Sequence, residues 1–135
     1  MAIKVLDSFA LMALFHDEPA AAEVEKLLVR TEAGHVRLLM CVVNWGEIYY
    51  SVMRGGSREL ADEKAREIAG MPIELVPVEI DLELTRQAAI FKAARRMSYA
   101  DCFAAALAKL HNAELVTGDP EFRSVEDQVK IAWLK

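Results

Sequence analysis

Short apolar segments of strand length alternate along this chain with longer segments of helical character. Five of the short segments are strand candidates, at residues 3–6, 38–43, 73–78, 114–117 and 129–134. Their nearly continuous hydrophobicity is typical of strands that are covered on both faces, as in a parallel sheet. This order predicts an α/β fold: a three-layer α/β/α sandwich around a mostly parallel central sheet of about five strands.

The segments between the strands predict helices, and the chain breakers fall where short connections belong. Pro19 separates the first two helices, and Gly55 with Gly56 ends the third. Because parallel strands need long crossover connections, helices between them favour βαβ units. The expected helices cover residues 9–15, 20–30, 44–54, 57–69, 81–96 and 99–111.

Length and composition bound the class of protein. With 135 residues, 54% of them hydrophobic, the chain is expected to fold as a single domain over residues 1–135. Its longest apolar stretch, residues 9–15, is well short of the ~20 residues that a membrane-spanning helix needs. Cys41 and Cys102 lack the spacing of a zinc site or a CxxC motif, which favours a reducing cytoplasm.

The charge balance argues against a passive nucleic-acid binder. Lys and Arg total 16 against 21 Asp and Glu, which gives a formal net charge of -5. Proteins that bind nucleic acid by charge alone normally carry excess positive charge. The balance does not exclude an enzyme that acts on nucleic acid, since bound divalent cations neutralise acidic groups where a phosphate approaches.

Four carboxylates occur at corresponding places in the predicted fold. Asp7 and Asp119 follow two strands, Glu47 lies one turn into the helix after a third, and Asp101 is in the first turn of another helix. Each has an ordinary structural explanation, as a helix cap, a turn residue or a solvated helix residue. Ligands of parallel α/β sheets bind beyond the carboxyl ends of the strands, so these four side chains are expected to converge.

Convergent carboxylates indicate a particular chemistry. They repel one another unless they are protonated or bridged by a cation. Oxygen ligands without His or Cys favour Mg²⁺ or Mn²⁺ over zinc. Gly46 and Gly118 leave room for close approach beside two of the acids. A cluster of this kind suits the hydrolysis of phosphodiesters.

The same residues carry a family resemblance that spans nearly the whole chain. Segments 5–8 (VLDS), 44–47 (NWGE), 98–101 (SYAD) and 117–120 (TGDP) resemble the PIN-domain ribonucleases, above all the VapC-type toxins of VapBC toxin–antitoxin pairs. The resemblance implies Mg²⁺- or Mn²⁺-dependent cleavage of RNA, a homodimer and a cognate VapB-like antitoxin.

The resemblance also assigns roles to residues. It implies that Asp7, Glu47, Asp101 and Asp119 bind metal and catalyse, with supporting hydroxyls at Thr117 and Ser8. Some relatives use a further acid near the last motif, for which Glu121 is the nearby candidate.

Three basic residues, Lys92, Arg95 and Arg96, end the helix before Asp101. They either complement the dipole at the helix C-terminus or attract RNA phosphates beside the metal site. Tyr49, Tyr50 and Met53 suit a subunit interface or core packing equally.

Other classes of function use similar residues. The same acids could serve a DNA-directed nuclease or a phosphohydrolase. A phosphoacceptor signalling module would want a lysine soon after a late strand, and none follows residues 114–117 closely. A non-catalytic protein that only binds partners is expected only if the acids fail to converge.

Overall fold

The computed structural model of the protein describes residues 1–135 and confirms the predicted α/β fold. Five strands form one sheet in the order β3-β2-β1-β4-β5, and every neighbouring pair is parallel. The strands are β1 (Ala2–Leu6), β2 (Val36–Cys41), β3 (Glu74–Val76), β4 (Glu114–Thr117) and β5 (Ile131–Trp133).

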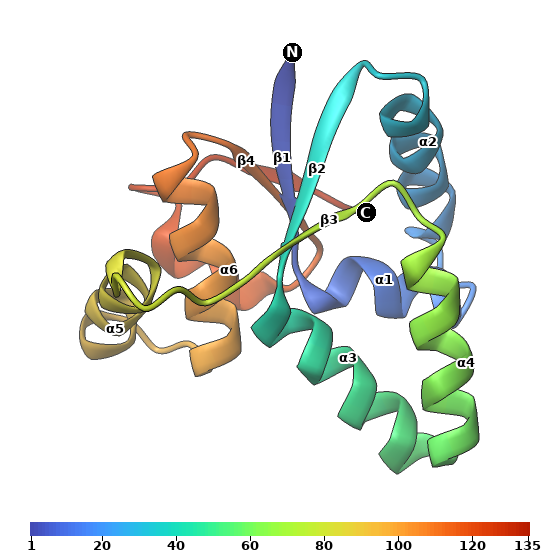
Figure 1. The fold of residues 1–135 in the computed structure, drawn as a ribbon. Helices are drawn as coiled ribbons and strands as arrows, with labels where there is room; N and C mark the ends of the chain where they lie inside the picture. Colours follow the sequence, from blue (N-terminus) through green and yellow to red (C-terminus); the bar gives the residue numbers. More distant parts are fainter.

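Six α-helices and one 3-10 helix connect and cover the strands (Figure 1). None of the helices combines the length and apolar character that a bilayer crossing requires. The helices are α1 (Ser8–Phe15), α2 (Ala21–Glu32), α3 (Val42–Gly55), α4 (Arg58–Ala69), α5 (Glu83–Ala94), α6 (Tyr99–Leu110) and η1 (Pro120–Val125).

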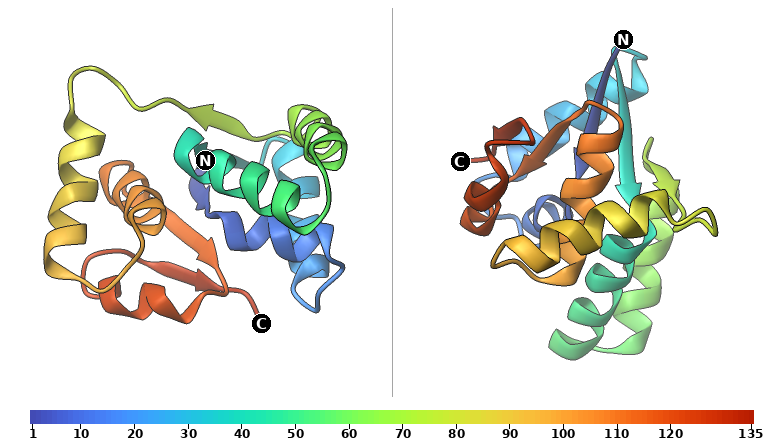
Figure 2. Two further views of the ribbon diagram at one scale, coloured as in Figure 1. Left: turned by 90° about the horizontal axis from the view of Figure 1, so that it is seen from below. Right: turned by 90° about the vertical axis from the view of Figure 1, so that its left-hand side faces the viewer.

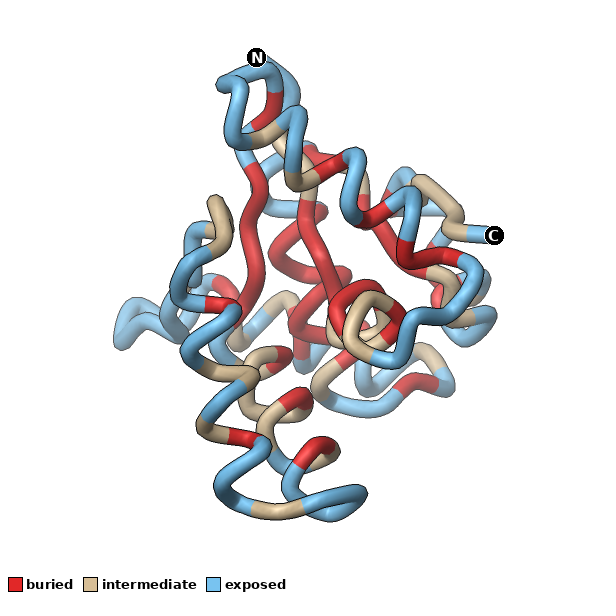
Figure 3. Tube along the Cα trace, turned by 90° about the vertical axis from the view of Figure 1, so that its right-hand side faces the viewer, coloured by how far each residue is buried: buried red, intermediate tan, exposed pale blue.

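Successive residues of the strands pack into two separate hydrophobic cores, one on each face of the sheet. The sheet and the helices on its two faces form the three layers. Val5 and Leu115 face a core built with α5, α6 and η1, whereas Leu6 and Val116 face a core built with α1 to α4. Burial is therefore concentrated in the central strands and the helix faces turned toward them (Figure 3). Apolar residues on both strand faces explain why the sequence reads as continuous apolar runs.

The carboxyl ends of the parallel strands all point to one edge of the sheet, where α1 and α3 begin (Figure 1). Beyond this edge α3 and α4 lie side by side as a projecting pair (Figure 2). The pairing of Leu6 with Val116 sets the ends of β1 and β4 next to each other. The fold thus brings residues 7 and 117 together although 110 positions separate them.

Candidate functional site

The acid that follows β1 is buried and held by two hydrogen bonds. Asp7 is 1% exposed and N-caps α1, because its Oδ1 accepts a hydrogen bond of 3.2 Å from the backbone N–H of Ala10. Its Oδ2 accepts one of 2.5 Å from the hydroxyl of Thr117 at the end of β4. Asp7 therefore caps a helix, as one interpretation of the sequence has it, and also lies at the edge of the sheet where the strands end.

Thr117 connects Asp7 to the acid that follows β4. The fully buried Thr117 Oγ1 also accepts a hydrogen bond of 3.0 Å from the backbone N–H of Asp119. In turn, Oδ1 of Asp119 accepts one of 2.9 Å from the backbone N–H of Glu121, in the first turn of η1. This chain of bonds fixes the turn after β4 against the end of β1.

Glu47 and Asp101 reach the same region from helices. The hydroxyl of Ser8 donates a hydrogen bond to Oε1 of Glu47 on α3. Asp101 lies in the first turn of α6, where Ser98 Oγ accepts from its backbone N–H at 3.1 Å and so caps the helix. Ser8, Glu47, Asp101 and Asp119 all line one pocket of about 440 Å³.

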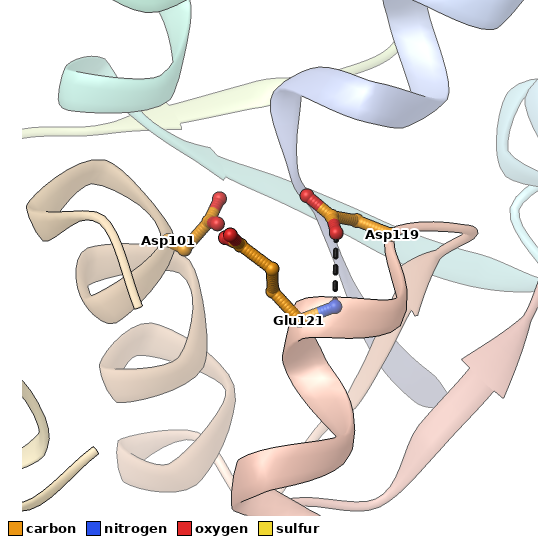
Figure 4. A group of neighbouring side chains, drawn as sticks. All are labelled: Asp101, Asp119 and Glu121. Atoms are coloured by element: carbon orange, nitrogen blue, oxygen red, sulfur yellow. Dashed lines mark hydrogen bonds between the residues drawn. The ribbon is translucent and has the colours of Figure 1, made fainter. Parts of the chain in front are cut away.

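Three carboxylates in this pocket form the tightest group. One oxygen from each of Asp101, Asp119 and Glu121 lies within 4.8 Å of the others. Figure 4 shows the side chain of Asp101, from the start of α6, directed toward the two acids of the turn after β4. The group holds two of the four acids predicted to bind metal and adds Glu121; Asp7 and Glu47 lie nearby but outside it.

The electrostatics of the pocket are unfavourable without a counter-charge. Burial raises the pKa of Asp7 to about 7, and the charges of Asp119 and Glu47 add to this against the hydrogen bonds from Thr117 and Ala10. Burial, followed by the hydrogen bond with Glu121 and the surrounding acids, raises the pKa of Asp101 to about 8.

The residues that line the pocket offer oxygen donors and no basic side chain. Besides the acids they include three serines, Ser8, Ser51 and Ser98, and two apolar side chains, Phe9 and Met12. Carboxylates without His or Cys are the donor set of Mg²⁺ and Mn²⁺. The acidic cluster therefore fits the metal site expected of this kind of fold.

The three basic residues predicted near the site do not line the pocket. Lys92 Nζ donates to the backbone oxygen of Met97 at 2.8 Å. Arg95 donates to the backbone oxygen of Ser124 at 2.7 Å and pairs with Asp127 at 3.0 Å. Arg96 is exposed and has no such side-chain partner.

The role of one buried residue beside the site was missed by sequence reasoning. Asn44, in the first turn of α3, is fully buried, and its Nδ2 donates to the backbone oxygen of Ala100 at 3.1 Å. It thereby ties the helix of Glu47 to the residue before Asp101, while its own Oδ1 is left without a partner. An amide inside an apolar stretch, three residues before Glu47, was the available signal.

A parallel sheet with acids gathered at its carboxyl edge is the arrangement expected of a PIN-like α/β domain. The family model of the PIN domain matches residues 4–128, and the chain belongs to this family. Among curated protein sequences, none matches significantly.

Within that class, the structure matches VapC toxins of VapBC complexes. The DNA-bound VapBC of Salmonella typhimurium has a TM-score of 0.75 at 14% identity over 98% of each chain. VapBC2 of Rickettsia felis, bound to a DNA fragment from its promoter, has a TM-score of 0.73 at 15% sequence identity. The match covers 98% of this chain and 99% of that one. VapC20 of Mycobacterium tuberculosis, a sarcin–ricin loop cleaving toxin, has a TM-score of 0.68 at 18% sequence identity. The match covers 92% of this chain and 95% of that one.

Proposed function

We propose that this protein is a Mg²⁺- or Mn²⁺-dependent endoribonuclease and the toxin of a type II toxin–antitoxin pair. The observation that carries the proposal is the group formed by Asp101, Asp119 and Glu121, whose carboxylate oxygens lie within 4.8 Å of one another. No basic side chain lines their pocket, so a bound cation is the natural counter-charge. Membership of the PIN family and the likeness to a sarcin–ricin loop cleaving toxin support RNA as the substrate.

We assign the ion to the four acids predicted from sequence, Asp7, Glu47, Asp101 and Asp119, and add Glu121 because of its place in the group. A bound Mg²⁺ or Mn²⁺ would polarise a phosphoryl oxygen and lower the pKa of a water molecule for attack on phosphorus. The protein's own residues hold the acids in place: Thr117 orients Asp7, and Ser8 orients Glu47.

Around this centre we assign phosphate attraction chiefly to Arg96, since Lys92 and Arg95 already have protein partners. The pairing with a VapB-like antitoxin, the homodimer and the cytoplasmic location are proposed from the family and from the VapBC complexes that the structure matches. The residues 1–135 are proposed to act as one domain.

The sharpest test is Asp119→Asn. Asparagine keeps an Oδ1 that can accept from the N–H of Glu121, as Asp119 Oδ1 does at 2.9 Å, but it removes the charge. We expect metal-dependent cleavage of labelled RNA to fall by at least about a hundredfold, the scale of losing one charge-stabilising group. DNA and a phosphomonoester run in parallel, with Mg²⁺, Mn²⁺ or EDTA, separate RNA cleavage from the other phosphate chemistries.

Asp81→Asn is the matched control, because Oδ1 of the exposed Asp81 accepts from the N–H of Glu83 in the same local pattern. It should cleave like the unchanged protein. Full activity of Asp119→Asn would refute the metal site, and activity that survives EDTA would refute the metal dependence. The same assay on the chain purified with the product of the neighbouring reading frame tests the antitoxin, since undiminished cleavage would contradict an inhibitory pairing.

A further inference from the structure

Phe9 is the large apolar side chain at the acidic pocket that no role described so far explains. It follows Ser8 in the first turn of α1 and lines the pocket together with Glu47, Asp101 and Asp119. It is half-buried rather than enclosed. An aromatic ring thus forms part of a wall whose other members are mainly carboxylates and hydroxyls.

Packing of the cores does not account for this ring. The chain has five phenylalanines. Three of them belong to the core under α5 and α6, and a fourth packs against the core under α1 to α4, namely Phe91, Phe103, Phe122 and Phe15. Phe9 belongs to neither core and is not among the residues packed against them. Its ring area at the pocket is therefore available to something other than the protein interior.

The ring of Phe9 lies against a glycine. A Cβ added to Gly118 would lie 2.5 Å from Cε1 and 2.8 Å from Cζ of Phe9, which is closer than real contacts allow. The ring edge therefore rests on the backbone between Thr117 and Asp119, the turn that carries one of the acids. Contact on this side restrains the ring before a ligand binds, which lowers the entropy lost on binding.

We infer that Phe9 is a stacking platform for the base of a nucleotide next to the scissile phosphate. This inference rests on the proposed function, because it places RNA in the pocket. Proteins that bind single-stranded RNA commonly stack its unpaired bases on aromatic side chains. The acids and their cation serve the phosphate, and the ring beside them serves the adjoining base. The enzyme should therefore prefer unpaired bases at the cleavage point over duplex RNA.

A double-mutant cycle tests the contact directly. The substrate is a single-stranded oligoribonucleotide that the unchanged protein cuts at one position, together with versions that are abasic on either side of that position. Phe9→Leu keeps an apolar side chain but removes the ring, and should lower kcat/KM on the intact RNA by roughly tenfold. On one of the abasic versions the same substitution should cost almost nothing, because the ring has lost its partner.

Two further variants sharpen the comparison. Gly118→Ala displaces the ring and should lose the same coupling to the same base. Phe15→Leu makes the matched change in the same helix, outside the pocket, and should keep the coupling intact. Thermal melts check that each variant is folded.

The outcomes separate the two proposals. If the unchanged protein cuts no RNA, the proposed function falls and takes the platform with it. If it cuts RNA but Phe9→Leu costs nothing, or costs the same on intact and abasic substrates, the platform alone is overturned. An equal loss on every substrate would mean that Phe9 acts only through the shape of the turn after β4.

Discussion

A single hydroxyl group, that of Thr117, organises two acids of the pocket at once. It donates to Asp7 at 2.5 Å and accepts from the backbone of Asp119 at 3.0 Å. Because Thr117 and Asp7 are both buried, water cannot replace the bond between them. The bond to Asp7 also lowers the pKa of that carboxyl against the effect of burial, so it stabilises the ionised form.

Thr117→Val keeps the shape of the side chain and removes both bonds. We expect the free energy of unfolding, measured in urea, to fall by about 1–3 kcal/mol, the cost of leaving buried polar groups unpaired. The loss should be larger at pH 8 than at pH 5, because Asp7, with a pKa of about 7, is charged only at the higher pH.

The matched control is Thr85→Val, since the hydroxyl of Thr85 is buried without any partner. That change should cost nothing or stabilise the protein. An equal effect of the two substitutions would mean that the hydrogen bonds of Thr117 contribute no net stability.

At the level of single residues, the sequence predicted the acids at the edge of the sheet better than the residues around them. Strand ends on a parallel sheet share an edge, so topology predicts that Asp7 and Asp119 lie close together, near the starts of the helices that carry Glu47 and Asp101. The space at Gly118 is confirmed by the ring of Phe9, whereas a Cβ at Gly46 would meet nothing within 4 Å. The membership of Glu121 in the tight group depends on how η1 turns, which local sequence does not specify.

At the scale of elements, the α3–α4 pair depends on contacts made away from the sheet. Tyr49 on α3 donates a hydrogen bond of 2.5 Å to Asp62 on α4, and its ring stacks on Trp45 with centroids 5.4 Å apart. Tyr49 packs against the core of α1 to α4, whereas Tyr50 is exposed beside Arg54. The sequence left core and interface open for both tyrosines, and the structure places them differently.

Tyr49→Phe removes the bond between the two helices and keeps the ring. The free energy of unfolding in urea should fall by about 0.5–1.5 kcal/mol, the net value of a typical hydrogen bond. Tyr50→Phe is the control, because Tyr50 donates no side-chain hydrogen bond that could be lost. A loss as large in Tyr50→Phe would show that the effect belongs to α3 in general.

The order of the elements was predictable, but several of their ends were not. The segment 114–117 is β4 as predicted, whereas the strand predicted over 38–43 is wrong at its end, because α3 already begins at Val42. Val42 and Val43 continue the apolar run, and Val43 still packs on a core, so hydrophobicity alone hides the change from strand to helix. The 3-10 helix η1 was not predicted, and the sequence indicated only a possible turn at Asp119.

At the scale of the whole molecule, buried acids should set the response of stability to pH. Without metal, Asp7 and Asp101 have pKa values raised from 3.8 to about 7 and about 8. At pH values between the ordinary and the raised pKa of each group, the folded protein holds a proton that the unfolded chain has released. The free energy of unfolding should therefore fall as pH rises from about 5 to 8. Ion-paired acids such as Glu114 and Asp127, whose pKa values are lowered, act in the opposite direction at lower pH.

Divalent metal should reverse this trend, because it binds the deprotonated carboxylates and releases their protons. Thermal melts in EDTA should show a lower Tm at pH 8 than at pH 6, and excess Mg²⁺ or Mn²⁺ should raise Tm more at pH 8. Asp101→Asn should flatten the EDTA profile and weaken the response to metal, since it removes one raised pKa and one ligand. Asp81→Asn, at an exposed acid outside the pocket, should leave both unchanged. A metal-free Tm that rises from pH 6 to pH 8 would contradict the raised pKa values of these carboxylates. An equal metal-induced shift of Tm at both pH values would mean that the ion does not bridge them.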